Sequence, residues 1–281
     1  MNSHRRESKF RIDYRLLQDV WEPAPWVNLG AWSETMDYRQ ACRNLAVQLG
    51  RFAEIDKCRK VIELGCGYGA GLHVWEEDFA VEQCDALEPN RDCIEFIRAN
   101  LPGCLGRIIP SAFEDLLDQQ PARKTGVEGT YDAVLCVDSD YFPPFIIGFT
   151  EGAVKLLRNG GTLAFHYFAR SQNEEPSLLM EKLLSLGGVA IEAMPNKKEL
   201  EKILVDLGYN HVRSENLTEQ VLGGFADFVR RRASQLKTTS KLCPSWIRIL
   251  VTGRLCRKIL AEGCLSYLMI RATRNTTGNR A

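Results

Sequence analysis

Apolar and polar stretches alternate along the chain after residue 60. Five short, nearly continuous apolar runs have the length and composition of buried strands, at 60–66, 81–89, 106–110, 131–137 and 162–168. Stretches between them, such as 71–79 and 90–101, carry apolar residues at helical spacing. This alternation predicts an α/β fold, a parallel sheet covered by helices on both faces.

The last third of the chain extends the same layout. Residues 196–209 predict a helix that stops at Gly208, residues 210–218 resemble a strand, and 264–274 predict a closing strand. Residues 217–262 predict helices, an insertion large enough to cover a ligand crevice. We therefore expect four parts: an N-terminal helical lid (1–50), a ligand-binding core (51–216), a helical cap (217–262), and a final strand with a tail (263–281).

The first predicted strand runs into a glycine-rich turn, VIELGCGYGAG at 61–71. Its GCGYGA fits the dinucleotide pattern G-x-G-x-x-(G/A), and Glu88 follows Gly67 by 21 residues, so a nicotinamide or flavin enzyme is one candidate. Glu63 favours another ligand. A buried carboxylate there needs a partner, such as a ligand ammonium or backbone N–H groups, and it would repel a diphosphate. The alternating glycines suit close approach to a compact ligand.

Further motifs follow the turn in an order that resembles class I S-adenosylmethionine-dependent methyltransferases. The resemblance rests on VIELGCGYGAG as their motif I, ALEPN as the acidic end of the second strand, SAFEDL as the adenine-contacting turn, VLCVDSD as the fourth-strand motif, and LLRNGGTLAF before the fifth strand. Asn159 stands where that family usually has proline. The motifs span about residues 26 to 274, which makes them more specific than the glycine turn alone.

The flanking segments resemble small-molecule methyltransferases of the ubiquinone/menaquinone, sterol and sugar O-methyltransferase type. VNLGAW and TMDYRQACRNLAVQLG resemble their N-terminal lid. The resemblance implies a Rossmann-like seven-stranded methyltransferase sheet with a helical cap, and S-adenosyl-L-methionine as cofactor. It implies cofactor contacts at the methionine end (Glu63, Gly65, Cys66, Gly67, Gly69), the ribose (Glu88, Pro89), the adenine (Ala112, Phe113), the sulfonium (Val137, Asp138) and the lid (Trp32, Tyr38).

Methyl transfer is an in-line displacement, so positioning can supply most of the acceleration, and a base is needed only when the acceptor must lose a proton. The resembled sugar methyltransferases often have a histidine after the fourth strand, where this chain has Tyr141 or Phe142. We expect His166, in the fifth strand, or Tyr141 to act as the catalytic base. The alternative for His166 is a hydrogen-bonded core histidine.

Composition adds three expectations. The 281 residues are 45% apolar and 26% charged, as in ordinary globular proteins. No apolar run is long enough to span a membrane, and the basic N-terminus has no apolar core behind it, which predicts a cytoplasmic protein. The ten cysteines lack metal-ligand spacing, which predicts free thiols and no bound metal.

Charge is uneven although the net charge is zero. Residues 228–281 hold twelve Lys and Arg against one acid, so this segment carries +11 and the rest of the chain −11. The aromatic residues of the lid favour a small-molecule acceptor, such as a natural product or secondary metabolite. The basic segment leaves two alternatives open: methyl transfer to a tRNA or rRNA base, and action on a lipid quinone or sterol at a membrane surface. We expect a monomer or a homodimer.

Overall fold

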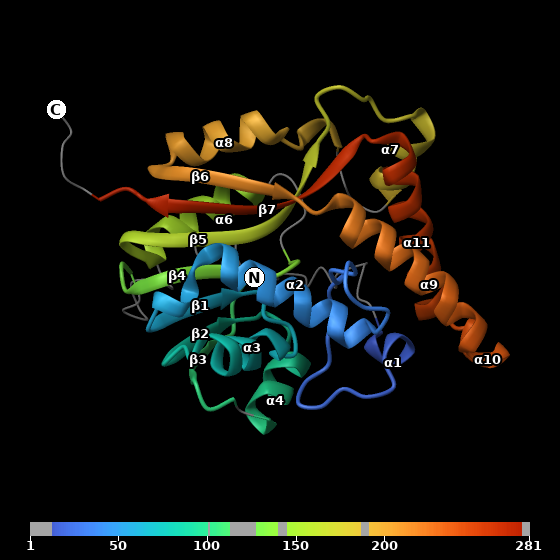
Figure 1. The fold of residues 1–281 in the computed structure, drawn as a ribbon, viewed down its shortest axis with the longest axis horizontal. Helices are drawn as coiled ribbons and strands as arrows, with labels where there is room; N and C mark the ends of the chain where they lie inside the picture. Colours follow the sequence, from blue (N-terminus) through green and yellow to red (C-terminus); the bar gives the residue numbers. More distant parts are fainter. Residues whose placement is uncertain (1–12, 101, 113–127, 140–144, 187–190, 277–281) are drawn as a thin grey trace, which may run out of the picture.

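A computed structural model describes residues 13–100, 102–112, 128–139, 145–186 and 191–276. Its centre is a seven-stranded sheet with the order β3-β2-β1-β4-β5-β7-β6 (Figure 1). The strands are β1 (Lys60–Leu64), β2 (Gln83–Leu87), β3 (Leu105–Ile109), β4 (Tyr131–Cys136), β5 (Leu157–Arg170), β6 (Tyr209–Asn216) and β7 (Leu265–Arg274). Strands β1 to β5 pair in parallel, and β7 runs antiparallel between β5 and β6. The predicted seven-stranded α/β fold is confirmed.

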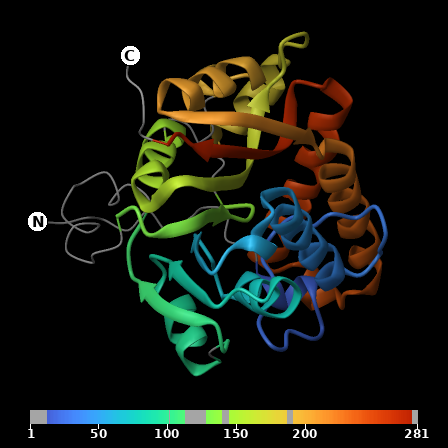
Figure 2. The same cartoon turned by 60° about the vertical axis from the view of Figure 1, so that its left-hand side comes forward.

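Helices cover both faces of this sheet (Figure 2). They are α1 (Tyr14–Leu17), α2 (Tyr38–Ala53), α3 (Ala70–Phe79), α4 (Arg91–Ala99), α6 (Phe145–Leu156), α7 (Leu178–Leu186), α8 (Lys197–Asp206), α9 (Gly224–Gln235), α10 (Thr238–Lys241) and α11 (Pro244–Glu262), with short helical turns η1 (Ile55–Lys57), η3 (Ile191–Ala193) and η4 (Glu219–Gly223). Helices α2 and α3 pack on one face of the sheet, and α6 and α8 on the other.

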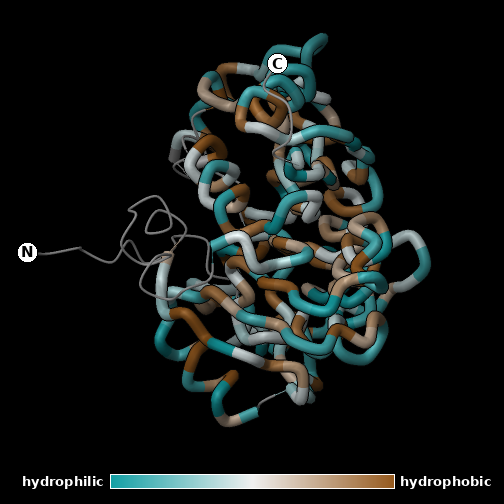
Figure 3. Tube along the Cα trace, turned by 90° about the vertical axis from the view of Figure 1, so that its left-hand side faces the viewer, coloured by the Kyte–Doolittle hydropathy of each residue, from teal (hydrophilic) through white to brown (hydrophobic). Residues whose placement is uncertain are grey.

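Alternation along the strands divides the apolar interior into two cores. Val61 of β1 and Leu135 of β4 belong to the core beneath α2 and α3, whereas Ile62 and Val134 belong to the core beneath α6 and α8. Successive side chains of a strand point to opposite faces, so near-continuous apolar runs are what a sheet covered on both sides requires. Figure 3 shows hydrophobic and hydrophilic stretches alternating along the described chain.

The strand order indicates where this fold would bind a ligand. The chain builds outward from β1 through β2 to β3, then returns to the other side of β1 with β4. The carboxyl ends of β1 and β4 therefore flank the point where the strand order reverses. In open α/β sheets, ligands bind in the crevice at this switch point.

One boundary differs from the sequence prediction. The strand predicted at 162–168 begins earlier, at Leu157, directly after α6 ends at Leu156. The chain is already extended at Leu157, which pairs with Tyr131 of β4. Pairing with the neighbouring strand thus overrides the local helical pattern.

The residues predicted as a helical cap form η4, α9, α10 and α11. Helices α9 and α11 lie side by side, with α10 at their free end (Figure 1). Gly253 of α11 allows close packing, because a Cβ at that position would lie 3.1 Å from the Val229 side chain. Across the described ranges, no helix is long and apolar enough to cross a membrane.

Candidate active site

The glycine turn joins β1 to α3 at the carboxyl end of β1. Gly65, Gly67 and Gly69 have positive φ angles of 71°, 56° and 84°. Glycine adopts this left-handed conformation at little cost, which explains its recurrence at every second position. The Gly65 N–H donates to the Leu87 carbonyl at 2.8 Å, so the turn is held against the end of β2.

Glu63 lies beneath the turn and is 2% exposed. One carboxylate oxygen accepts a hydrogen bond from Trp75 Nε1 at 2.7 Å. Gly71, in the first turn of α3, leaves room for the carboxylate, since a Cβ there would lie 2.7 Å from both carboxylate oxygens. Burial raises the pKa of Glu63 to about 8, and the charge of Glu88 adds to the rise. A cation beside Glu63 would stabilise its charged form.

Glu88 connects the glycine turn to α4. Its Oε2 accepts from the Gly67 N–H at 2.9 Å, and its Oε1 accepts from the Asn90 N–H at 2.8 Å. Asn90 in turn caps α4 by accepting from the N–H groups of Asp92 and Cys93. The two carboxylates, Glu63 and Glu88, therefore flank the same turn at the ends of adjacent strands.

Asp138 follows β4 and has a φ of 52°, unusual for a residue with a side chain. Its Oδ2 accepts from the Leu29 N–H at 2.6 Å, and its Oδ1 accepts from the Tyr267 hydroxyl. Burial raises the pKa of Asp138 to about 7, although both hydrogen bonds act to lower it. Strained backbone held by long-range partners is frequent at functional sites.

His166 lies on β5 beside Asp138 and is fully buried. Its Nδ1 accepts from the Asp138 backbone N–H at 3.3 Å, so in the neutral ring the proton resides on Nε2. Nε2 has no hydrogen-bond partner among the described residues. The ring stacks on Tyr267 with centroids 5.5 Å apart, and burial lowers the pKa of His166 to about 3. The role of His166 as a base stays a prediction.

Residues 26–32, which we call the strap, run from the glycine turn to Asp138. At one end, the side chain of Val27 lies 3.4 Å from the position a Cβ on Gly67 would take. Further along, the Leu29 N–H binds the Asp138 carboxylate. The strap therefore covers the carboxyl ends of β1 and β4, where the sequence predicted a lid.

Trp32 and Tyr38 fix the strap to the cap. Trp32 Nε1 donates to the Leu29 carbonyl at 2.7 Å, and the Tyr38 hydroxyl donates to the Asn28 carbonyl at 2.8 Å. Both rings stack on Phe228 of α9, at centroid distances of 4.9 and 5.3 Å. Their predicted contact with the cofactor stays a prediction.

Gly224→Ala should weaken the packing of the strap against the cap. A Cβ on Gly224 would lie 2.2 Å from Trp32 Cβ, so helix and strap must separate. We expect a loss of about 1–3 kcal/mol in the free energy of unfolding, measured by urea denaturation. Gly223→Ala is the control, since its Cβ would meet the end of the flexible Glu219 side chain at 3.1 Å and Leu260 Cδ1 at an ordinary contact distance of 3.5 Å. Equal stability of the two variants would contradict this packing.

Four further predicted residues follow the carboxyl ends of β1 to β4. Cys66 is buried in the glycine turn, Val137 is buried after β4, Pro89 is exposed, and Ala112 is half-buried. All ten cysteines are free thiols. Phe113 and Tyr141 lie outside the described residues. Within the described ranges, no three His, Cys, Asp or Glu side chains gather as metal ligands would.

Sequence reasoning missed three members of the site: Leu29, Trp75 and Tyr267. Trp75 was predicted only as an apolar position of a helix, although it follows Glu63 by 12 residues and donates to its carboxylate. Tyr267 reaches Asp138 because β7 pairs with β5, which places Tyr267 opposite Phe168. No local signal in the sequence identifies either partnership.

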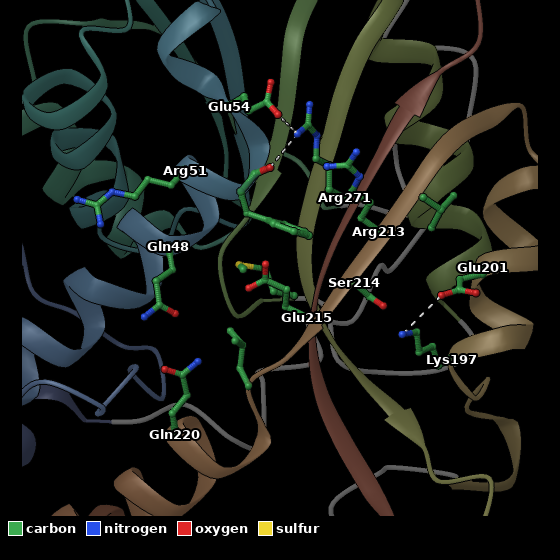
Figure 4. A pocket seen from close by; sticks show the side chains of 14 residues that line it. Gln48, Arg51, Glu54, Lys197, Glu201, Arg213, Ser214, Glu215, Gln220 and Arg271 are labelled. Carbon is green, nitrogen blue, oxygen red and sulfur yellow. Dashed lines mark hydrogen bonds and ion pairs between the residues drawn. The ribbon is translucent and has the colours of Figure 1, made fainter.

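An open groove of 890 Å³ lies elsewhere, between α2 and the β6–β7 edge (Figure 4). Its lining includes Arg51, Arg213 and Glu215, and Arg271, which pairs with Glu54 at 2.5 Å. The lining includes no residue of the glycine turn, nor Glu88 or Asp138. The groove is thus separate from the residues at the switch point.

Comparisons with known proteins agree with this geometry. No family model matches the chain. The erythromycin 3''-O-methyltransferase of Saccharopolyspora erythraea is 25% identical over 268 residues, covering 89% of this chain and 85% of that protein. Two solved structures share the fold. A mycolic acid cyclopropane synthase complexed with S-adenosylhomocysteine superposes with a TM-score of 0.71 at 13% identity, covering 93% of each chain. A geranyl diphosphate methyltransferase in complex with S-adenosylmethionine gives 0.60 at 14%, covering 85% of this chain and 87% of that one.

The structural likenesses establish the fold. The similarity to the curated relative and the order of the motifs along the chain support assignment to the class I S-adenosylmethionine-dependent methyltransferases. The cofactor expected from the sequence is confirmed by this assignment, and the nicotinamide alternative falls away.

Proposed function

We propose that this enzyme transfers the methyl group of S-adenosylmethionine to a hydroxyl oxygen of a small-molecule natural product. The observation that best supports this proposal is the extent of the sequence similarity to the erythromycin 3''-O-methyltransferase. It covers 89% of this chain, and the remainder is too short to contain both the strap and the cap. The sequence similarity therefore extends beyond the cofactor-binding core into at least part of the strap or of the cap.

Cofactor binding would use the groups around the switch point. Glu63 would receive the ammonium of the methionine end, with the N-terminus of α3 and the turn of Gly65, Gly67 and Gly69 near its carboxylate. Glu88 would accept from the ribose hydroxyls. Ala112 and Phe113 would flank the adenine, and Val137 with Asp138 would lie near the sulfonium.

Asp138 is our proposed proton acceptor for the hydroxyl. Its pKa of about 7 suits a base that works near neutral pH, and its deprotonated form is stabilised by Leu29 and Tyr267. His166 is better suited to positioning, since its Nδ1 lone pair is engaged by the Asp138 N–H and its pKa is lowered to about 3. Tyr141, the alternative base expected from the sequence, lies outside the described residues, and its catalytic role stays a prediction.

Calorimetric titration with S-adenosylmethionine and with NAD tests the cofactor site. We expect S-adenosylmethionine to bind, NAD not to bind, and Glu88→Gln to weaken S-adenosylmethionine binding by about 10-fold or more, because a carboxylate holds hydroxyls more strongly than an amide does. Glu95→Gln, exposed on α4, is the matched control. Equal affinity in both variants would remove Glu88 from the ribose site.

The acceptor is tested by mass spectrometry after incubation with S-adenosylmethionine and a panel of glycosylated macrolides, phenols, amines and transfer RNA. Methyl transfer to hydroxyl oxygens of the small molecules is the expected result. Methylation confined to nitrogen, carbon or RNA bases would overturn the proposal.

A further inference from the structure

The free end of the cap exposes aliphatic side chains. Leu242 is 74% exposed, Ile247 50% and Val251 51%. Leu242 lies between α10 and α11, and Ile247 and Val251 are one turn apart on the same side of α11. The opposite side of α11, including Trp246, Ile249 and Cys256, is buried against the rest of the protein. The exposed aliphatic groups are therefore not part of the packing of the cap.

Four cations lie close to these side chains in the sequence. Lys237, Lys241, Arg248 and Arg254 are exposed or half-buried, and none has an acidic partner among the described residues. Arg254 lies on the side of α11 that carries Ile247 and Val251, seven residues after Ile247. We call Lys237, Lys241, Leu242, Ile247, Arg248, Val251 and Arg254 the cap face.

We infer that the cap face docks on an anionic lipid surface. A face that combines unpaired Lys and Arg with aliphatic side chains fits the boundary between phosphate headgroups and acyl chains. RNA fits less well, since binding of single strands uses aromatic platforms, and the three exposed apolar residues here are aliphatic. Residues 217–262, the cap, hold nine Lys and Arg against three acids and carry +6, which leaves −6 on the remainder, so an anionic surface would attract the cap and repel the core.

Docking there leaves the reaction site accessible. The cap face lies on the outer side of α11. The buried side of α11 faces the site, because it includes Cys256, whose thiol pKa is raised by burial and by the charge of the nearby Asp138. The inference concerns attachment of the enzyme and holds for any acceptor. Its failure would therefore be distinct from failure of the proposed function.

Vesicle co-sedimentation tests the docking, using the full-length protein with vesicles of phosphatidylcholine alone or of equal parts phosphatidylcholine and phosphatidylglycerol. We expect binding only to the anionic vesicles, weakening as salt rises. Arg248→Gln with Arg254→Gln should weaken it about tenfold or more, since each cation near such a surface contributes about fivefold. Ile247→Ser with Val251→Ser should also weaken it, and the remaining binding should become more sensitive to salt.

The control carries the same kinds of change on α8, Lys202→Gln with Val205→Ser, both exposed and distant from the cap (Figure 1). Unchanged binding in this control, with loss in the cap-face variants, supports the inference. Equal binding to both kinds of vesicle, or to neither, overturns it. Salt-dependent binding to transfer RNA that survives Ile247→Ser with Val251→Ser, without vesicle binding, overturns it in favour of a nucleic-acid surface.

Discussion

Glu63→Gln is expected to lower the affinity for S-adenosylmethionine by about 10- to 100-fold, because an amide cannot make the charge-assisted hydrogen bond that a carboxylate makes to an ammonium. The exchange keeps an oxygen in place to accept from Trp75 Nε1, so the fold should be retained. Titration calorimetry measures the affinity. Glu77→Gln, exposed on α3, is the control.

Proton release separates this role from a purely structural one. Without ligand, the pKa of Glu63 is about 8, so near neutral pH the group is mostly protonated. An arriving ammonium should lower that pKa and expel the proton. Calorimetry in two buffers of different ionisation enthalpy should therefore detect proton release in the wild type and little in Glu63→Gln. Equal release, or equal affinity, would remove Glu63 from the ammonium site.

The same residue should affect stability in the absence of ligand. Its pKa in the folded protein, about 8, exceeds the ordinary value of 4.5, so the folded state holds the proton more tightly. The contribution of Glu63 to the free energy of unfolding is then fully present below about pH 4.5, and it is lost as the pH rises through about 8. Urea denaturation should show a smaller fall in Glu63→Gln than in the wild type. The remaining slope would include Asp138, whose pKa is also raised.

Local patterns were enough to predict the sheet and the glycine turn. A run such as DAVLCV is apolar on both faces, which suits a strand between two layers of helices. Gly65, Gly67 and Gly69 occupy left-handed positions, and that requirement is visible in the sequence as strict alternation. Glu63 could be identified because a buried carboxylate inside an apolar strand needs a partner.

The partners themselves could not be predicted, because they come from distant parts of the chain. Leu29 reaches Asp138 only after the strap has crossed the strand ends, and Tyr267 depends on the antiparallel register of β7 on β5. His166 illustrates the consequence. Its strand position predicted a residue near the crevice, but its pKa and the state of Nδ1 are determined by burial and by the Asp138 backbone, which no local pattern encodes.

Asp138→Asn should lower kcat by about 10²- to 10⁴-fold, the usual contribution of a general base, while S-adenosylmethionine still binds. The wild-type rate should fall as pH drops through about 7, since protonation of Asp138 removes the proton acceptor. Stopped assays over a range of pH, with binding measured separately, check both. Loss of cofactor binding with little change in kcat would assign Asp138 to the cofactor alone.

Tyr267→Phe distinguishes a base from a residue that only holds the strap. The Tyr267 hydroxyl donates to Asp138 and lowers its pKa, so removing it should raise the pKa further and move the pH–rate profile to higher pH. At high pH the variant should recover most of the wild-type rate, because the carboxylate is then ionised without the tyrosine. A loss of rate that is the same at every pH would indicate a structural role for this contact, and the proton acceptor would then have to be sought among the other groups at the strand ends.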